Sequence, residues 1–244
     1  MLQVLLLFNN LKLTPWENPH SPTPLSGNVN TFSLFGLVPV FVPFSFMTSQ
    51  NIHPIQDRLL ARTVRESSNK HKGGVFWLCG LSGSGKSTLA LLLEKYLFEK
   101  NIQNLVIDGD DVRSGLCQDL GFSIDDRKEN IRRVSEIAKL MTRNGFVVIV
   151  SLISPTKEIR EYAKEIIGEE DFFEIFVKSS FEKCKQRDVK GLYAKLDRGK
   201  IDSFTGKDST FEEPTSPWLL LDTENTPIEA SMTKLSSAII NEVV

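Results

Sequence analysis

Between an apolar run at residues 75–79 and a helix-forming run at residues 89–98, the chain reads Gly80-Leu81-Ser82-Gly83-Ser84-Gly85-Lys86-Ser87. This octapeptide matches the pattern G-x-x-x-x-G-K-[ST], which binds nucleotide phosphates when a strand precedes it and a helix follows it. The glycines let the backbone approach phosphate oxygens, so that N–H groups and the helix N-terminus can hold the negative charge. In such a loop the lysine reaches the β- and γ-phosphates, and the serine hydroxyl binds magnesium. A chance glycine- and serine-rich turn is the alternative, but the flanking strand and helix favour a nucleotide site from Gly80 to Thr88, with Lys86 catalytic and Ser87 a metal ligand.

Outward from this loop, strand and helix patterns alternate along the chain. Apolar and β-branched runs predict five strands, at residues 75–79, 105–107, 146–153, 172–177 and 218–221. Apolar residues three and four positions apart predict the helices between them, and the last helix is expected to begin with Thr226 as its N-cap and Pro227 in its first turn. Such alternation is typical of an α/β fold. We expect a P-loop NTPase-type, doubly wound, parallel five-stranded sheet with helices on both faces.

The composition excludes some classes of protein. The 244 residues include 29 basic and 31 acidic side chains, so the net charge of −2 argues against a general nucleic-acid binder. The three cysteines are an odd number without metal-ligand spacing, which suggests neither a disulfide framework nor a zinc site. We therefore expect a cytoplasmic protein.

Residues 1–46 differ from the rest of the chain, with only two charged side chains and six of the eleven prolines. Their longest apolar run, residues 32–46, is interrupted by prolines and is shorter than the roughly 20 residues of a membrane-spanning helix. Residues 2–8 resemble the apolar part of a signal peptide, without a positive segment before them or a clear cleavage site after them. A span, a targeting segment, and an unstructured or spurious leader before Met47 are the open alternatives. We favour the last, with one phosphate-loop domain over residues 47–244 and no membrane association.

Acidic residues follow the second predicted strand, at Asp108-Gly109-Asp110-Asp111. The strand at residues 146–153 runs into Ser154-Pro155 without the aspartate of motor ATPases, and no Asn-Lys-x-Asp guanine reader follows the loop. If Gly109 provides a turn, Asp108 and Asp110 can lie together, hold magnesium and accept a proton from an attacking hydroxyl. The alternative is a solvated turn.

Further motifs occur in a fixed order. They are Asp108-Gly-Asp-Asp-Val-Arg113, Asp119-Leu-Gly-Phe122-Ser, Asp126-Arg127, Glu129-Asn130-Ile-Arg-Arg133, Ile153-Ser154-Pro155, Arg187-Asp188, Lys190-Gly-Leu-Tyr193 and Phe204-Thr-Gly206. As a set they closely resemble the adenylyl-sulfate kinase family over about residues 72–222. The resemblance implies transfer of the γ-phosphoryl group of ATP, with Mg²⁺, to the 3′-hydroxyl of adenosine 5′-phosphosulfate.

The resemblance also implies residue roles. Asp110 is expected to be the base and a magnesium ligand, and Arg187 to join the ATP site. The expected substrate-binding residues are Arg113, Phe122, Arg127, Asn130, Ile153, Ser154, Lys190 and Phe204. Arginine's planar fork suits a dianionic phosphosulfate, and an adenine between Phe122 and Phe204 would gain about 1–3 kcal/mol per stacking contact. Arg132 and Arg133 are interpreted as a solvated helix face. Residues 190–214 are expected to form a mobile lid that excludes water.

Ser154 has two interpretations. The matching serine of the family is described as a phosphorylated intermediate, whereas Ser154-Pro155 before a helix also fits an N-cap with proline in the first position. Direct transfer needs no phospho-enzyme, so we favour Ser154 as a cap and a substrate contact, and we group it with Asp110 and Lys86 as a catalytic residue.

Some positions depart from the family. Asp111 stands where asparagine is usual, and Lys207 replaces an apolar residue. Both put charge beside the substrate, so the reaction type is better determined than the affinity. Another P-loop small-molecule kinase, a non-catalytic nucleotide-binding module and a membrane-tethered regulator are the alternative functions. A homodimer is an open prediction.

Overall fold

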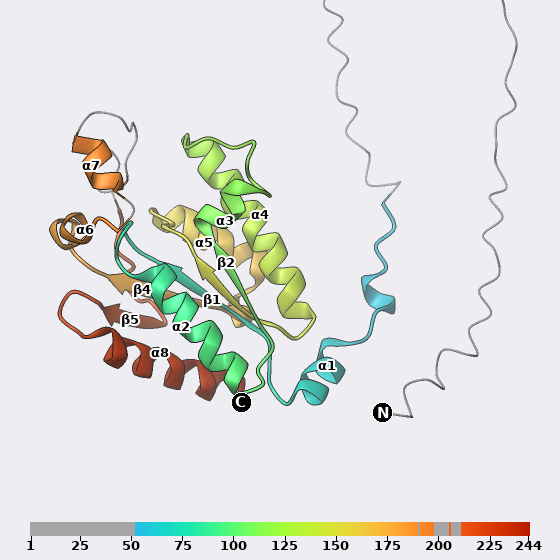
Figure 1. The fold of residues 1–244 in the computed structure, drawn as a ribbon. Coiled ribbons are helices and arrows are strands. Elements are labelled where there is room, and N and C mark those ends of the chain that lie inside the picture. Colours follow the sequence, from blue (N-terminus) through green and yellow to red (C-terminus); the bar gives the residue numbers. More distant parts are fainter. Residues whose placement is uncertain (1–51, 190, 198–204, 206–210) are drawn as a thin grey trace, which may run out of the picture. The chain divides into compact units, whose positions relative to one another are not determined.

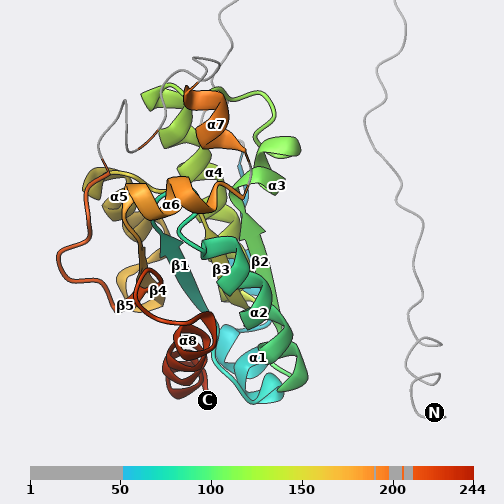
Figure 2. The same cartoon turned by 60° about the vertical axis from the view of Figure 1, so that its left-hand side comes forward.

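In the part of the chain that the structure describes, five parallel strands form a central sheet in the order β2-β3-β1-β4-β5 (Figures 1 and 2). They are β1 (Gly74–Cys79), β2 (Asn104–Asp108), β3 (Val147–Ser151), β4 (Phe172–Lys178) and β5 (Leu219–Asp222). Each predicted strand is present, with ends that differ by at most two residues from those expected. The predicted five-stranded parallel sheet is confirmed.

The computed structural model describes residues 52–189, 191–197, 205 and 211–244, without the side chains of 196 and 197. The chain divides into Met1–His53, of which only the last two residues are described, and the compact unit Pro54–Val244. The predicted leader (residues 1–46), Lys190, Phe204 and most of the predicted lid lie outside the described residues.

Helices cover both faces of the sheet, as predicted (Figures 1 and 2). They are α1 (Arg62–Asn69), α2 (Lys86–Glu99), α3 (Gly109–Ser114), α4 (Ile124–Arg143), α5 (Lys157–Ile167), α6 (Phe181–Arg187), α7 (Leu192–Asp197) and α8 (Ile228–Val243), with short 3₁₀ turns at Gln56–Arg58 and Glu169–Asp171. In the described part of the chain, no helix is long and apolar enough to cross a membrane.

The core has two halves, one on each face of the sheet. Trp77 and Val150 pack with α4 and α5, whereas Phe76 and Ile149 pack with α2 and α8. Every residue of β1 is buried, because side chains of alternating direction meet helices on both faces. This explains why β1 reads as a continuous apolar run and not as an alternating one.

The start of α8 differs from the prediction. Its N-cap is Pro227, and no side chain caps it, so the assignment of Thr226 as N-cap is wrong. The backbone N–H of Thr226 donates to the carbonyl of Asp222 (3.1 Å), and the Asp222 carboxylate accepts from the N–H groups of Glu224 and Asn225. The turn after β5 therefore extends through Thr226, and the helix begins one residue later.

Candidate active site

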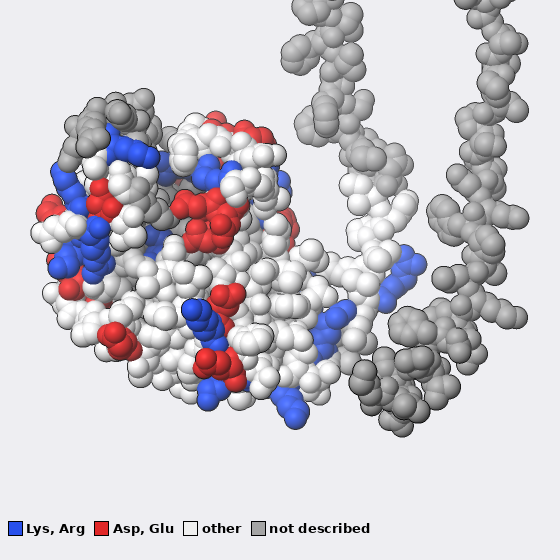
Figure 3. All heavy atoms as spheres, in the orientation of Figure 1, with Lys and Arg blue, Asp and Glu red and all other residues white. Residues whose placement is uncertain are grey.

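A cleft of about 840 Å³ opens at the carboxyl ends of the strands, where ligands bind in open α/β sheets. Its lining includes predicted site residues from every part of the sequence: Ser82, Gly83, Gly85, Lys86, Ser87, Thr88, Asp110, Arg113, Phe122, Arg127, Asn130, Ile153, Ser154 and Arg187. Gly80, Leu81 and Ser84 belong to the same loop but are not in the lining. On the face shown in Figure 3, acidic and basic side chains are interspersed, and both gather around the hollowed upper part.

The phosphate loop joins β1 to α2, and its first position, Gly80, has room only for glycine. Gly80 has φ of 149°, and a Cβ placed there would lie 2.5 Å from the carbonyl oxygen of Val177. No other residue type fits so close to a neighbouring strand. The buried Lys86 side chain curls back along the loop, and its Nζ donates to the carbonyls of Gly80 (2.9 Å) and Leu81 (2.8 Å).

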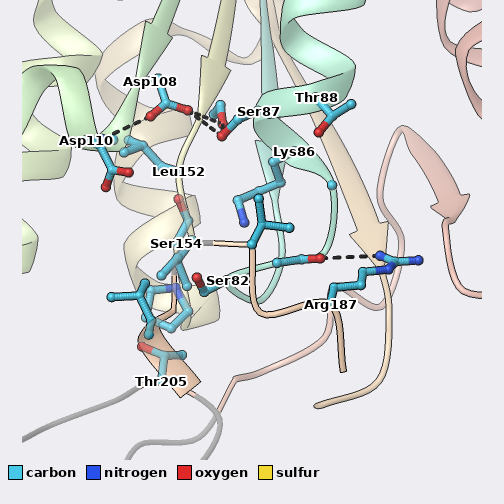
Figure 4. A pocket seen from close by; sticks show the side chains of 18 of the residues that line it. Ser82, Lys86, Ser87, Thr88, Asp108, Asp110, Leu152, Ser154, Arg187 and Thr205 are labelled. Atoms are coloured by element: carbon cyan, nitrogen blue, oxygen red, sulfur yellow. Dashed lines mark hydrogen bonds between the residues drawn. The ribbon is translucent and has the colours of Figure 1, made fainter. Parts of the chain in front are cut away.

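Two serines converge on the carboxylate at the end of β2. Ser87 Oγ and Ser151 Oγ donate to Asp108 Oδ2 at 2.7 and 2.9 Å, and Asp108 Oδ1 accepts from the N–H of Asp110 at 3.0 Å (Figure 4). Asp108 is thus the N-cap of α3 and lies directly beside the predicted metal ligand Ser87. The sequence interpretation considered Asp108 but assigned the metal to Ser87 and Asp110.

Asp110 lies in the first turn of α3 and lines the cleft, and Figure 4 shows Asp110, Lys86 and Ser154 around one opening. The role expected of Gly109 is corrected. It is the first residue of α3, and it is not among the residues with positive φ. A Cβ at Gly109 would lie 2.9 Å from Leu152 Cδ2, so a larger residue there requires the Leu152 side chain to shift, whereas the backbone conformation does not require glycine.

The opposite wall of the cleft comes from α3, α4 and the loop between them. The guanidinium of Arg113 lies 4.3 Å from the centre of the exposed Phe122 ring, and its Nη1 donates to the carbonyl of Gly121 at 2.8 Å. Arg127 Nε donates to the carbonyl of Phe122 (3.0 Å), and its Nη1 donates to Thr205 Oγ1 (3.0 Å). Burial lowers the pKa of Arg127, and the charge of Arg113 adds to this. Two neighbouring cations in a partly desolvated wall favour an anionic ligand.

Asn130 also belongs to this wall. It is only 3% exposed, and its Nδ2 has no hydrogen-bond partner among the described residues. A buried donor without a partner is costly in a folded protein, so this amide points to a ligand acceptor in the cleft.

Ser154 follows β3, and its assignment as an N-cap is wrong. The N-cap of α5 is Thr156, whose Oγ1 accepts from the N–H of Ile159. The Ser154 hydroxyl is used otherwise, because it accepts a buried hydrogen bond of 2.9 Å from Trp77 Nε1.

The backbone of Ser154 is also held by a hydrogen bond from a buried arginine. Its φ is 46°, in the left-handed region, and its carbonyl accepts from the buried Arg160 (2.9 Å), which pairs with Glu174 at 2.7 Å. This network fixes Ser154 facing the cleft. Nothing in the sequence pattern identified Trp77 or Arg160 as its supports.

Three further arginines that the sequence analysis singled out are Arg132, Arg133 and Arg187. Arg132 and Arg133 form ion pairs with Glu129, and Arg133 also with Asp119, on the outer side of α4, in agreement with a solvated face. Arg187 donates to the carbonyls of Gly83 (3.3 Å) and Thr223 (2.5 Å), so it lies against the phosphate loop. Its role in the ATP site stays a prediction.

Comparison with known proteins assigns the chain to a family. The adenylylsulphate kinase family model matches residues 72–222. The adenylyl-sulfate kinase of Phocaeicola vulgatus is 47% identical over 194 residues, which is 80% of this chain and 95% of that protein. The enzyme of Bacillus velezensis is 52% identical over 157 residues, covering 64% of this chain and 80% of its own.

Solved structures agree with the sequence comparison. An APS kinase of Mycobacterium tuberculosis, determined in complex with AMPPNP and APS, has a TM-score of 0.67 at 43% identity, covering 69% of this chain and 98% of its own. The predicted fold, family and kinase class are therefore confirmed. Matched in sequence and in structure across its phosphate loop and its cleft, the chain belongs to the adenylyl-sulfate kinase family.

Proposed function

We propose that this enzyme transfers the γ-phosphoryl group of ATP to the 3′-hydroxyl of adenosine 5′-phosphosulfate, giving ADP and 3′-phosphoadenylyl sulfate. The observation that carries the proposal is that one cleft joins a phosphate loop to a wall of two arginines, a phenylalanine and a buried amide. A phosphate donor and an anionic nucleotide acceptor can thus share one opening. The complex of the Mycobacterium tuberculosis relative with AMPPNP and APS supports this division.

The donor site is formed by residues 80–88, with Arg187 beside them. Lys86 Nζ already lies at the loop, bonded to its carbonyls, and it exchanges these neutral acceptors for phosphate oxygens when ATP binds. A bond between an ammonium and a phosphate is roughly twice as strong as a neutral one. Lys86 therefore stabilises the β- and γ-phosphates.

The residues at the end of β2 fit magnesium. Ser87, Asp108 and Asp110 offer hydroxyl and carboxylate oxygens, the ligands that Mg²⁺ prefers, and Mg²⁺ is usually held by one or two carboxylates together with substrate phosphates and water. We assign Ser87 and Asp110 as ligands and add Asp108, because it contacts Ser87 directly. When bound, Mg²⁺ would neutralise the charge on the β- and γ-phosphates.

Asp110 has the second task of accepting a proton. The 3′-oxygen of the acceptor forms a bond to the γ-phosphorus, the bond between that phosphorus and the β-γ bridging oxygen breaks, and the hydroxyl proton passes to the Asp110 carboxylate. Its position in the cleft wall near Lys86 supports this role. Because the transition state of phosphoryl transfer is loose, positioning contributes more than proton removal.

Ser154 acts as a substrate contact in this scheme and not as a covalent intermediate. Its oxygen is held by Trp77 and its backbone by Arg160, which suits a fixed wall of the acceptor site. Direct transfer needs only that donor and acceptor be aligned.

The acceptor site is the wall of Arg113, Phe122, Arg127 and Asn130, with Ile153 beside Ser154. The arginines bind the phosphosulfate, the Phe122 ring stacks on the adenine and the Asn130 amide donates to an acceptor of the ligand. Lys190 and Phe204 complete the site in the proposal, although both lie outside the described residues.

A coupled ADP-release assay tests this function. We expect ADP formation with adenosine 5′-phosphosulfate to exceed that with AMP or shikimate by at least about 100-fold in kcat/KM, since a buried polar site rejects acceptors that leave its groups unpaired. Preference for AMP would instead assign a nucleoside monophosphate kinase. Binding of Mg-ATP without ADP release from any acceptor would assign a non-catalytic module.

Assembly and location are also proposals. We propose a homodimer, which light scattering of the purified chain would test. An APS kinase of Thiobacillus denitrificans, 28% identical with a TM-score of 0.52, is described as hexameric, although this match covers only 29% of that chain. Cys79, Cys117 and Cys184 are buried and unpaired, which supports the reducing cytoplasm as its location.

A further inference from the structure

Side chains from three distant parts of the chain hold the phosphate loop by its carbonyl groups. Tyr193 Oη on α7 donates to the carbonyl of Ser82 at 2.8 Å, and Arg187 Nη1 at the end of α6 donates to Gly83 at 3.3 Å. Thr223 Oγ1, directly after β5, donates to the carbonyl of Ser84 at 2.7 Å. Lys86 holds the carbonyls of Gly80 and Leu81. Each carbonyl from residue 80 to residue 84 therefore accepts a side-chain hydrogen bond.

These bonds also determine where the amide groups of the loop point. No peptide bond of the described residues is cis, and in a trans peptide the C=O of one residue and the N–H of the next point in opposite directions. Thr223 therefore turns the Gly85 N–H away from itself, and Tyr193 does the same for Gly83. Both glycines line the cleft and have positive φ values, 80° at Gly83 and 105° at Gly85. Glycines have the widest conformational freedom, so these two amides depend most on outside support.

Thr223 is itself firmly placed. It is only 8% exposed, its N–H donates to the carbonyl of Lys178 at the end of β4 (3.0 Å), and its own carbonyl accepts from Arg187 (2.5 Å). A hydroxyl has one hydrogen to donate. The carbonyl of Ser84 is the nearer acceptor, because Lys178 O lies at 3.1 Å. The sheet thus fixes Thr223, and Thr223 fixes the loop.

We propose that Thr223 is a positioning residue for phosphoryl transfer, and that Tyr193 assists it. By holding the carbonyls of Ser84 and Ser82, they aim the Gly85 and Gly83 amides at the ATP phosphates before ATP arrives. Donors that need no reorganisation stabilise the developing charge of a transition state most effectively. This inference rests on the proposed function, because it assumes that the loop is the ATP site.

The test compares four variants of the full chain. Thr223→Val keeps the shape and removes the hydroxyl, Thr223→Ser keeps the hydroxyl, and Tyr193→Phe removes the second donor. Thr233→Val is the matched control, because the exposed Thr233 Oγ1 donates to the carbonyl of Glu229 within α8. For each variant, ATP and adenosine 5′-phosphosulfate are varied separately in the ADP-release assay, and thermal unfolding is recorded.

We expect Thr223→Val to lower kcat/KM for ATP by at least about fivefold, the size of one hydrogen bond left unmade at a buried carbonyl. The KM for adenosine 5′-phosphosulfate should change by less than about twofold, since the effect of one hydrogen bond stays local. Thr223→Ser should restore most of the loss, Tyr193→Phe should act in the same direction, and Thr233→Val should behave as the wild type.

Other results distinguish a wrong assignment of the function from a wrong assignment of Thr223. Absence of ATP-dependent turnover in the wild type would refute the proposed function itself. With an active wild type, an unchanged kcat/KM for ATP in Thr223→Val would refute only the positioning role. So would equal losses for both substrates that follow a lowered unfolding temperature, because these indicate a structural role. If Thr223→Val does not fold, Tyr193→Phe decides, and unchanged ATP kinetics in that variant would overturn the inference.

Discussion

Lys86 is the residue whose loss tests the donor site most directly. Its side chain is buried and its Nζ donates to two carbonyls of its own loop, and we expect Lys86→Ala to leave the fold intact. We expect turnover to fall by more than about 100-fold, because the transferred phosphoryl group loses the cation that we propose stabilises it. ADP release and thermal unfolding measure both effects, and Lys95→Ala, at an exposed position of the same helix, is the control. Activity within about tenfold of the wild type, or ~1.4 kcal/mol, would show that the loop is not the ATP site.

Substitutions of three neighbouring aspartates can separate the binding of magnesium from the acceptance of a proton. Asp110→Asn should reduce the rate by at least about 100-fold, the low end for general base catalysis, with acceptor binding weakened far less. Asp108→Asn should mainly raise the magnesium concentration needed for half-maximal rate, since it loses the charge beside Ser87. Asp111→Asn should be nearly neutral, because Asp111 is exposed and Asp110 is the one of the two that lines the cleft. If Asp111→Asn were the damaging change and Asp110→Asn the mild one, the assigned catalytic acid would be wrong by one position.

At the scale of elements, the sequence correctly predicted those features whose structure depends on residues close together in the chain. The phosphate loop and the strands could be located because their glycine spacing and apolar runs depend on neighbours in sequence. The cap at Thr226 was wrong because the turn after β5 extends through that residue, as the bond from its N–H to the Asp222 carbonyl shows. The cap at Ser154 was wrong because a distant group, Trp77, holds its hydroxyl. Thr223 was missed for the same reason, since its partner Ser84 lies 139 positions away along the chain.

The outer face of α4 gives a prediction about pH. Hydrogen bonds from Arg132, then Arg133, lower the pKa of Glu129 from 4.5 to about 2. A folded-state pKa below the unfolded value means that the ion pairs stabilise the protein above pH 4.5 and lose this effect as the pH falls toward 2. The effect on stability is small, because the group is partly exposed to water. Glu129→Gln should therefore lower Tm slightly at pH 7, by an amount that shrinks steadily as the pH falls from 4.5 toward 2, whereas Glu136→Gln, at an exposed position of the same helix, should show no such trend. A Tm difference that is independent of pH would contradict the assignment.

At the scale of the whole molecule, the question is where the functional unit begins. The family match starts at residue 72, but α1 lies before it and is tied to the sheet. Arg62 donates to Asp171 (2.6 Å), just before β4, and to the carbonyl of Gly73 (3.0 Å), while Glu66 accepts from the Gly73 N–H (2.8 Å). These contacts connect α1 to the starts of β1 and β4, so the boundary of the stable unit should lie before Arg62.

Two shortened chains test this boundary. A chain that starts at Met47 keeps α1 and every residue of the cleft, and we expect unchanged kcat/KM and Tm. A chain that starts at Gly73 loses the Arg62 and Glu66 contacts, and we expect Tm to fall by several degrees, since each 1 kcal/mol corresponds to about 2–4 °C in a domain of this size. Its kcat/KM at low temperature should change little, because α1 supplies no residue of the cleft. Loss of soluble protein or of activity on starting at Met47 would instead make residues 1–46 part of the functional unit, and an unchanged Tm on starting at Gly73 would show that α1 does not stabilise the sheet.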